Sequence, residues 1–405
     1  MPDTLITNIG ELVYFSPSGE KLIREKNCAL YVVDGLIRSF GSQDEVLSNA
    51  SGNPKEIDAR GCLVTPSFVD CHTHLVFAGK RAYEFRRRIE GESYLEIAER
   101  GGGILSTVRS TREASEEQLV EIARRRLDGM LRCGTSVVEA KSGYGLTTED
   151  ELKMLSATEK AGRDHPIEII PTFLGAHATP QEYKEDREGY VDLICDEMLP
   201  AVKEQGIAKY CDVFCDKGAF TVNEMERIFT RAKELGFELR AHLNEFENLD
   251  GVRVACELGA VSVDHLTKSD RDDAEAIKDA DCVAVLLPGT TFFLGESEYA
   301  DYRMFKGEGC RVAVASDFNP GSSMCYCLQS VAIICAVYLG MTPEEILRAM
   351  TIEPAYSLGM ADEFLWREGV PARVNIYDVE TLEELIYPWG VNHVRGVVVG
   401  DGYFS

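Results

Sequence analysis

Eight short apolar runs, rich in β-branched residues and separated by charged segments, constrain the fold of this 405-residue chain more than any other feature. The alternation of such runs with segments of helical period is typical of parallel β-α units. Eight units are the number that closes a (β/α)8 barrel. The runs cover residues 63–74, 135–141, 167–177, 210–216, 238–245, 260–265, 281–288 and 311–317.

The segments between the runs predict helices, and one of them is unusually long. We expect helices over 116–131, 148–162, 182–204, 223–235, 248–258 and 270–278. The first run is followed by an insertion over 75–134 that contains Gly101, Gly102 and Gly103. This triple glycine lacks the strand-then-helix context of a phosphate-binding loop, so we expect a flexible loop that acts as a lid over the barrel mouth.

Both ends of the chain have the pattern of short strands and turns. Asp34-Gly35 between two apolar runs is a two-residue hairpin signal, and the segments 372–377 and 394–402 have the same strand-turn character. We therefore predict an α/β protein in which 1–64 and 365–405 form a small composite β-sandwich domain. The (β/α)8 TIM barrel is expected over 65–364.

Composition narrows the possible partners and compartment. The 42 basic and 68 acidic residues give a net charge of -26, which argues against binding nucleic acid or an anionic membrane. No apolar run approaches the ~18 residues of a membrane span. Thirteen cysteines without a Cys-x-x-Cys motif do not fit a secreted disulfide framework. These features predict a cytoplasmic protein with no nucleic-acid or membrane partner.

Most of the histidines lie at the carboxyl ends of the predicted strands, where barrel enzymes have their active sites. Five of the seven lie at such ends: His72, His74, His177, His242 and His265. The other two, His165 and His393, lie elsewhere, and for these we expect structural roles. The eighth run ends in a carboxylate, Asp317.

Three of these histidines and the aspartate predict a metal site. His72 and His74 are two residues apart, so in an extended segment they point the same way. Together with His242 and Asp317 they suit one divalent or trivalent metal ion, zinc or iron. A water polarised by that ion would become the nucleophile, with Glu245 as general base. His265 would orient the water or polarise the bond under attack.

These residues resemble the motif of the amidohydrolase superfamily, and the surrounding text is similar to one of its families, the imidazolonepropionases. The resemblance spans nearly the whole barrel and extends into the last segment. The matching stretches are 68–79, 141–146, 171–177, 284–289, 317–322 and 390–394. It implies hydrolysis of the cyclic amide C–N bond of 4-imidazolone-5-propanoate to N-formimidoyl-L-glutamate in histidine degradation.

The resemblance also implies roles for individual residues. It assigns metal ligation to His72, His74, His242 and Asp317, with Glu245, His265 and Asp317 in catalysis. It assigns substrate contacts to Arg81, Tyr144, His177, Asn319, Gly321 and Ser322. A small substrate with a carboxylate fits the planar fork of Arg81 in an otherwise acidic protein. Tyr144 lies between glycines, which favours ligand contact over core packing. Family members also suggest a homodimer.

Some features depart from the family pattern or leave alternatives open. Ser67, Leu243, Asn244 and the 324–327 segment are atypical, and Leu243 and Asn244 beside His242 could alter the substrate preference. Lys217 directly follows the fourth run, at the strand end where two-metal amidohydrolases place a bridging modified lysine, although the mononuclear family matches elsewhere. A related amidohydrolase or aminohydrolase acting on another small heterocycle is the alternative enzyme. A binding protein that lost its chemistry is a third reading, although no proposed catalytic group is missing.

Overall fold

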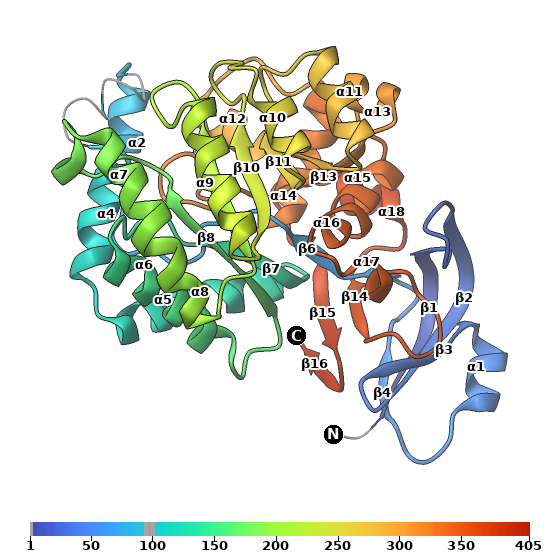
Figure 1. Ribbon diagram of the computed structural model, residues 1–405. Helices are drawn as coiled ribbons and strands as arrows, with labels where there is room; N and C mark the ends of the chain where they lie inside the picture. The colour runs from blue at the N-terminus through green and yellow to red at the C-terminus, as the bar shows by residue number, and fades with distance from the viewer. Residues whose placement is uncertain (1–2, 93–96, 98–101) are drawn as a thin grey trace.

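A parallel eight-stranded barrel is the central element of the protein (Figure 1). The computed structural model describes residues 3–92, 97 and 102–405. The barrel strands pair in chain order from β6 to β13, which confirms the expected (β/α)8 architecture. They are β6 (Phe68–Asp70), β7 (Thr135–Lys141), β8 (Glu168–Ala176), β9 (Tyr210–Cys215), β10 (Glu238–Leu243), β11 (Ala260–His265), β12 (Val283–Leu286) and β13 (Arg311–Val314).

The first and last barrel strands meet through bonds just beyond their ends. The backbone N–H of Asp317 donates to the carbonyl of His72 over 3.0 Å, and the N–H of His74 donates to the carbonyl of Phe318 over 2.9 Å. The N–H of Ser316 donates to Oδ1 of Asp70 over 3.0 Å. These bonds bring the residues that follow β6 directly beside those that follow β13.

The predicted run over 63–74 is two strands rather than one. Its first part, β5 (Leu63–Pro66), belongs to a different sheet and pairs with a C-terminal strand. The partner changes within one residue, because the N–H of Ser67 donates to the carbonyl of Arg373 and the N–H of Phe68 donates to that of Gly134. Only β6 is a barrel strand here, and both histidines of the His-x-His pair lie after it.

Several predicted helices are confirmed to within one residue, and side-chain caps explain where they begin. Ser115, Thr221 and Asp270 each form a capping box at a helix start. The barrel helices are α5 (Glu116–Arg132), α6 (Thr148–Gly162), α7 (Arg187–Leu193), α8 (Leu199–Gln205), α9 (Val222–Glu234), α10 (Gly251–Glu257), α11 (Arg271–Asp279), α12 (Pro288–Leu294), α13 (Tyr302–Glu308), α14 (Leu328–Ile334), α15 (Pro343–Ala349), α16 (Ile352–Ser357) and α17 (Ala361–Phe364).

Two predicted helices begin later than expected. The helix expected from residue 182 starts at α7, where the Asp186 side chain accepts from the N–H of Gly189, and continues through a π-helical segment (Ile194–Met198) into α8. The helix expected from residue 248 starts at Gly251, because Asp250 has a left-handed backbone with φ 61°. The insertion after β6 contains α2 (Ala82–Ile89) and α4 (Ile104–Glu113) rather than only a loop.

The expected lid can be followed only in part. Gly101 lies outside the described residues. Gly102 and Gly103 lead directly into α4, and Gly103 has the positive φ of 67° that a glycine adopts without strain. The lid therefore stays a prediction.

The two ends of the chain pair as predicted in one mixed sheet of order β16-β15-β14-β5-β1-β2-β3, with β4 against β1. Asp34 and Gly35, at φ 50° and 75°, form the expected hairpin turn. The remaining elements are β1 (Thr4–Phe15), β2 (Leu22–Val33), β3 (Leu36–Ser42), α1 (Gln43–Asn49), β4 (Lys55–Asp58), β14 (Arg373–Tyr377), α18 (Leu382–Ile386), β15 (Val394–Val399) and β16 (Gly402–Phe404). The domain limits at 64/65 and 364/365 stay a prediction.

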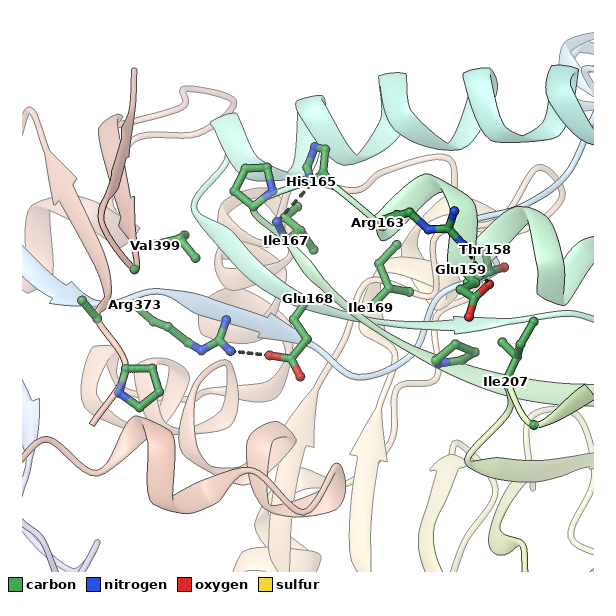
Figure 2. A pocket seen from close by; sticks show the side chains of 17 residues that line it. Thr158, Glu159, Arg163, His165, Ile167, Glu168, Ile169, Ile207, Arg373 and Val399 are labelled. Carbon is green, nitrogen blue, oxygen red and sulfur yellow. Dashed lines mark hydrogen bonds and ion pairs between the residues drawn. The ribbon is translucent and has the colours of Figure 1, made fainter. Parts of the chain in front are cut away.

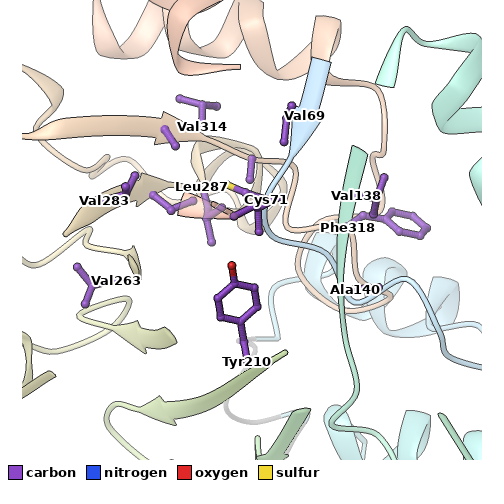
Figure 3. Close-up of a cluster of buried hydrophobic side chains, with 14 of the residues drawn as sticks. Val69, Cys71, Val138, Ala140, Tyr210, Val263, Val283, Leu287, Val314 and Phe318 are labelled. Atoms are coloured by element: carbon purple, nitrogen blue, oxygen red, sulfur yellow. The ribbon is translucent and has the colours of Figure 1, made fainter. Parts of the chain in front are cut away.

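Apolar side chains of the barrel strands pack into one buried cluster, part of which is drawn in Figure 3. Val69, Val138, Val263, Val283 and Val314 come from five different strands and are completely buried. Parallel strands covered on both faces favour such β-branched residues. No helix among the described residues is long and apolar enough to cross a membrane.

Candidate metal and active site

Three imidazoles meet at the carboxyl end of the barrel. His72 and His74 follow β6, and His242 lies near the end of β10. One nitrogen from each lies within 4.8 Å of the others, and all three side chains are buried. Oδ1 of Asp317 lies 3.4 Å from Nε2 of His72 and 3.5 Å from Nε2 of His74. The four residues expected as ligands are thus brought together.

The atoms that face this cluster suit a metal ion. Nε2 of His72, Nε2 of His242 and Oδ1 of Asp317 are buried and have no hydrogen-bond partner among the described residues. Such buried polar atoms normally have partners. Imidazole nitrogens with one carboxylate oxygen are a donor set that zinc and iron both accept. The other oxygen of Asp317 accepts a bond of 2.6 Å from the Thr290 hydroxyl, which fixes the carboxylate.

Carboxylates behind the cluster hold two of the imidazoles. Nδ1 of His72 lies 2.6 Å from Oδ2 of Asp264, and Nδ1 of His242 lies 3.0 Å from Oδ1 of Asp212. Sequence reasoning missed both aspartates. A signal was present, because each is a charged residue inside a predicted barrel strand, where a charge is rare unless it is paired.

The surroundings separate the pKa values of these groups. Burial opposes protonation of His72, but the Asp264 and Asp317 carboxylates outweigh it and raise its pKa to about 9. Burial lowers the pKa of His242 to about 4 and that of His265 to about 3. Burial would raise the pKa of Asp317, but the His72 and His74 imidazoles beside its carboxylate hold that pKa well below the usual value. Imidazoles bind a metal ion in their neutral form, so metal binding at this cluster depends on pH.

Glu245 lies on the loop after β10 and faces His265, with its Oε2 3.7 Å from Nδ1 of that imidazole. Asp216 holds this loop by accepting bonds from the N–H groups of Glu245, Phe246 and Glu247 over 2.6, 3.1 and 3.0 Å. Burial, with the nearby charges of Asp317 and Asp216, raises the pKa of Glu245 well above that of an ordinary carboxyl. A perturbed carboxyl beside a metal cluster is a candidate for proton transfer.

Backbone strain gathers at the same strand ends. Asn244, His265, Leu266 and Asp317 have φ values of 58°, 81°, 62° and 48°. Non-glycine residues in this region carry strain that folded proteins keep mainly at functional sites. Asn244, one of the residues that depart from the family pattern, has its side-chain amide bound to Ser269 and Asp273.

Arg81 lies at the wall of the site and is bound by a glutamate. Its Nε donates to Oε2 of Glu84 over 2.7 Å, and both side chains are buried. The guanidinium also packs against Gly321, where a Cβ atom would lie 2.2 Å from Nη1. Gly321 therefore makes room for Arg81, a role that the sequence did not suggest.

The other expected substrate contacts fall into two groups. The His177 ring stacks on the His74 ring with 4.8 Å between their centroids, and the centroid of the Tyr144 ring lies 5.2 Å from that of His177. The Asn319 side chain is used to build its own loop: Oδ1 accepts from the N–H groups of Gly321 and Ser322, and Nδ2 donates to the carbonyl of Asp317.

A cavity of about 60 Å³ joins these groups. It includes three residues that sequence reasoning did not select, Ile104, Phe214 and Phe246. Its lining consists of His74, Arg81, Ile104, Tyr144, His177, Phe214, His242, Glu245, Phe246, His265, Asp317, Asn319 and Ser322.

Lys217 is not part of that lining. Its side chain is 65% exposed, and its Nζ lies 2.9 Å from Oε2 of Glu247. A larger open pocket of about 700 Å³, drawn in Figure 2, lies around the start of β8 and β14 and includes His165, Glu168 and Arg373. It contains none of the expected site residues. Because barrel enzymes carry their chemistry at the opposite, carboxyl ends of the strands, we do not assign the site there.

Comparisons with known proteins agree with this geometry. The model of the amidohydrolase family matches residues 63–364. The chain is 45% identical to an imidazolonepropionase of Symbiobacterium thermophilum over 98% of its length and 96% of that protein. It is 40% identical to an imidazolonepropionase of Alkaliphilus metalliredigens, over 98% and 97% of the two chains. Among solved structures, a triazine hydrolase variant has a TM-score of 0.77 at 17% identity, covering 99% of this chain and 94% of that one, which shows the shared fold. The chain therefore belongs to the amidohydrolase family and, within it, to the imidazolonepropionases.

Proposed function

We propose that this protein hydrolyses the cyclic amide C–N bond of 4-imidazolone-5-propanoate and releases N-formimidoyl-L-glutamate, a step of histidine degradation. One observation carries the proposal. Two of the three clustered imidazoles, His74 and His242, line the same cavity as Asp317 and the buried Arg81, in a chain 45% identical to an imidazolonepropionase. The candidate metal ligands suit amide hydrolysis, and the arginine suits a substrate with a carboxylate.

We propose His72, His74, His242 and Asp317 as the ligands of one metal ion, zinc or iron. When bound, such an ion acts as a Lewis acid and lowers the pKa of water at the site toward neutrality. Lys217 does not support a second ion, because its ammonium group is exposed and paired with Glu247.

The remaining site residues bind the substrate and move protons. Arg81 pairs with the propionate, since its guanidinium offers the planar fork that matches a carboxylate. His177 and Tyr144 pack against the ring, and the Asn319–Ser322 loop completes the wall. The cavity of about 60 Å³ is smaller than the roughly 300–1,000 Å³ of typical ligand sites, so side chains of its lining must move when the substrate enters.

Proton transfer falls to Glu245. Its carboxylate takes a proton from the attacking water and returns it to the ring nitrogen as the C–N bond breaks, so that one water is consumed and the ring opens. Neutral His265, whose pKa is lowered to about 3 by burial, donates an N–H to the oxygen on which negative charge develops.

The test follows the absorbance of freshly made 4-imidazolone-5-propanoate after adding the protein, with metal content measured on the same sample. We expect faster decay, about one metal ion per chain, and loss of activity in the His242→Ala variant or after treatment with a chelator. A decay rate unchanged by the protein would contradict the substrate assignment. Full activity of a metal-free sample would contradict the metal assignment, and ammonia release from other heterocycles would favour an aminohydrolase.

The compartment and assembly are also proposals. All 13 cysteines are free, which suits a reducing compartment such as the cytoplasm. A homodimer is supported by a group of exposed apolar side chains on the surface. Tyr387 is 89% and Trp389 58% exposed, and the ring centroids of Trp389 and Phe292 are 6.0 Å apart. Light scattering on the purified protein distinguishes a dimer from a monomer.

A further inference from the structure

A group of charged side chains with no exposed surface lies beneath the three imidazoles. Its members come from four of the barrel strands, β7, β9, β10 and β11, and are Glu139, Lys141, Asp212, Arg240 and Asp264. Buried charges are costly unless they are paired and hydrogen-bonded. Five of them directly behind a candidate metal centre therefore call for a physical explanation.

Lys141 is the centre of this group. Its ammonium donates to Oδ2 of Asp212 over 2.6 Å and to Oε1 of Glu139 over 2.8 Å, and it lies 3.8 Å from Oδ2 of Asp264. An ammonium has three donors and no acceptor, so it orients any carboxylate that it contacts. One lysine thus reaches both of the aspartates that contact the ligand histidines.

The two aspartates pass this orientation on to the imidazoles. Asp212 uses one oxygen for Lys141 and the other for Nδ1 of His242, at 3.0 Å. Oδ2 of Asp264 lies 2.6 Å from Nδ1 of His72. An imidazole that donates from Nδ1 to a carboxylate presents the lone pair of Nε2 on its other side, and such partners are known to fix ligand histidines. In both residues Nε2 is the buried atom without a partner that faces the cluster.

We propose that Lys141 is a positioning residue of the metal centre, which acts through Asp212 and Asp264 to hold His242 and His72 in the ligating orientation before a metal ion arrives. This inference rests on the proposed metal site. The lysine that serves this centre is then Lys141 and not Lys217. Its role is to orient the ligand histidines, whereas Lys217 was considered as a bridge between two ions.

Zinc affinity of the metal-free full-length protein tests the inference without an activity assay. Zn²⁺ is titrated in competition with a chromophoric chelator at one pH for the wild type, Lys141→Met, Asp212→Asn and the double variant. Loss of a partner behind a ligand histidine typically weakens metal binding by about 10- to 100-fold, which we expect for each single variant. Lys141 acts partly through Asp212, so the effects of the two changes should not multiply. We expect the zinc affinity of the double variant to be at most about threefold lower than that of the weaker-binding single variant. The exposed Lys217→Met is the matched control and should bind zinc as the wild type does.

The design separates positioning from a general loss of stability. Lys141→Met leaves buried carboxylates unpaired, so thermal unfolding of each metal-free variant is measured alongside. If Lys141→Met does not fold, the zinc affinity of the double variant is compared with that of Asp212→Asn alone. The double variant loses one positive and one negative charge, so the net charge of the buried group is unchanged. Wild-type zinc affinity in Lys141→Met, or losses that multiply in the double variant, would overturn the inference. A wild-type protein that binds no zinc or iron would instead overturn the proposed metal site, and this inference with it.

Discussion

Nε of Arg81 donates to Oε2 of Glu84 over 2.7 Å, and the other oxygen of Glu84 accepts the backbone N–H of Gly103 over 3.0 Å. The proposed carboxylate anchor is thus tied to the start of α4, which places Ile104 in the lining of the same cavity. A side chain as flexible as arginine gains a defined direction from such a contact.

Removing the charge of Arg81 should weaken substrate binding more than chemistry. A charge-assisted hydrogen bond contributes about 1.5–3 kcal/mol, so Arg81→Met is expected to raise KM roughly 10- to 100-fold with a smaller change in kcat. Glu84→Gln should raise KM less, because it loosens the anchor without removing it. The control Arg86→Met changes a side chain that is 80% exposed and should have wild-type kinetics. An unchanged KM in Arg81→Met would rule out Arg81 as the anchor.

A methyl group at Gly321 should act on the same anchor from the other side. The added Cβ would lie 2.2 Å from Nη1 of Arg81, so the guanidinium has to move. We expect Gly321→Ala to raise KM while the metal content stays that of the wild type. The matched control is Gly307→Ala on α13, where a Cβ meets no atom within 4 Å. A Gly321→Ala enzyme with normal KM would show that the position of Arg81 does not matter for binding.

The pH profile should report the raised pKa of Glu245. A general base works only when ionised, so activity is lost as the pH falls through its pKa. Burial and the charges of Asp317 and Asp216 raise that pKa in the free protein, which places the acid limb of kcat/KM above the ~4.3 of an ordinary glutamate.

Glu245→Gln should lower kcat by about 10²- to 10⁴-fold and remove this limb from the remaining activity. Asp216→Asn should move the limb toward lower pH, because it removes one of the repelling charges. Glu247→Gln, two residues further on and paired with exposed Lys217, is the control. An acid limb that persists in Glu245→Gln would assign the titration to another group.

Cysteine labelling should single out Cys327. A hydrogen bond from Cys133, outweighing burial, lowers the pKa of Cys327, and the N–H groups of Ser330 and Gln329 act in the same direction. Burial raises the pKa of Cys325 and Cys62. Because the thiolate is the reactive form, iodoacetamide near pH 7 should modify Cys327 first, as peptide mapping by mass spectrometry would show. Cys133→Ala should slow the labelling of Cys327, and faster labelling of Cys62 would contradict the prediction.

Local sequence determined the number and order of the barrel strands and, through them, the ligand residues. Strand propensity and helical period are short-range properties, so the runs that contain β7 and β10 could be recognised without the fold. The rule that chemistry lies at the carboxyl ends of barrel strands then selected His72, His74, His242 and Asp317. The structure brings these four side chains together.

Only the tertiary structure decided which groups are paired. The run over 63–74 divides at Pro66 because its backbone donors find different partners in two sheets, which a single strand pattern does not reveal. Asp264 contacts His72 across 192 positions of sequence, and the guanidinium of Arg81 fills the space beside Gly321. Hydrogen-bond partners of buried charges and the space beside a glycine depend on residues far away in the chain. The sequence therefore identifies the candidate ligands, whereas the folded structure determines what holds them in place.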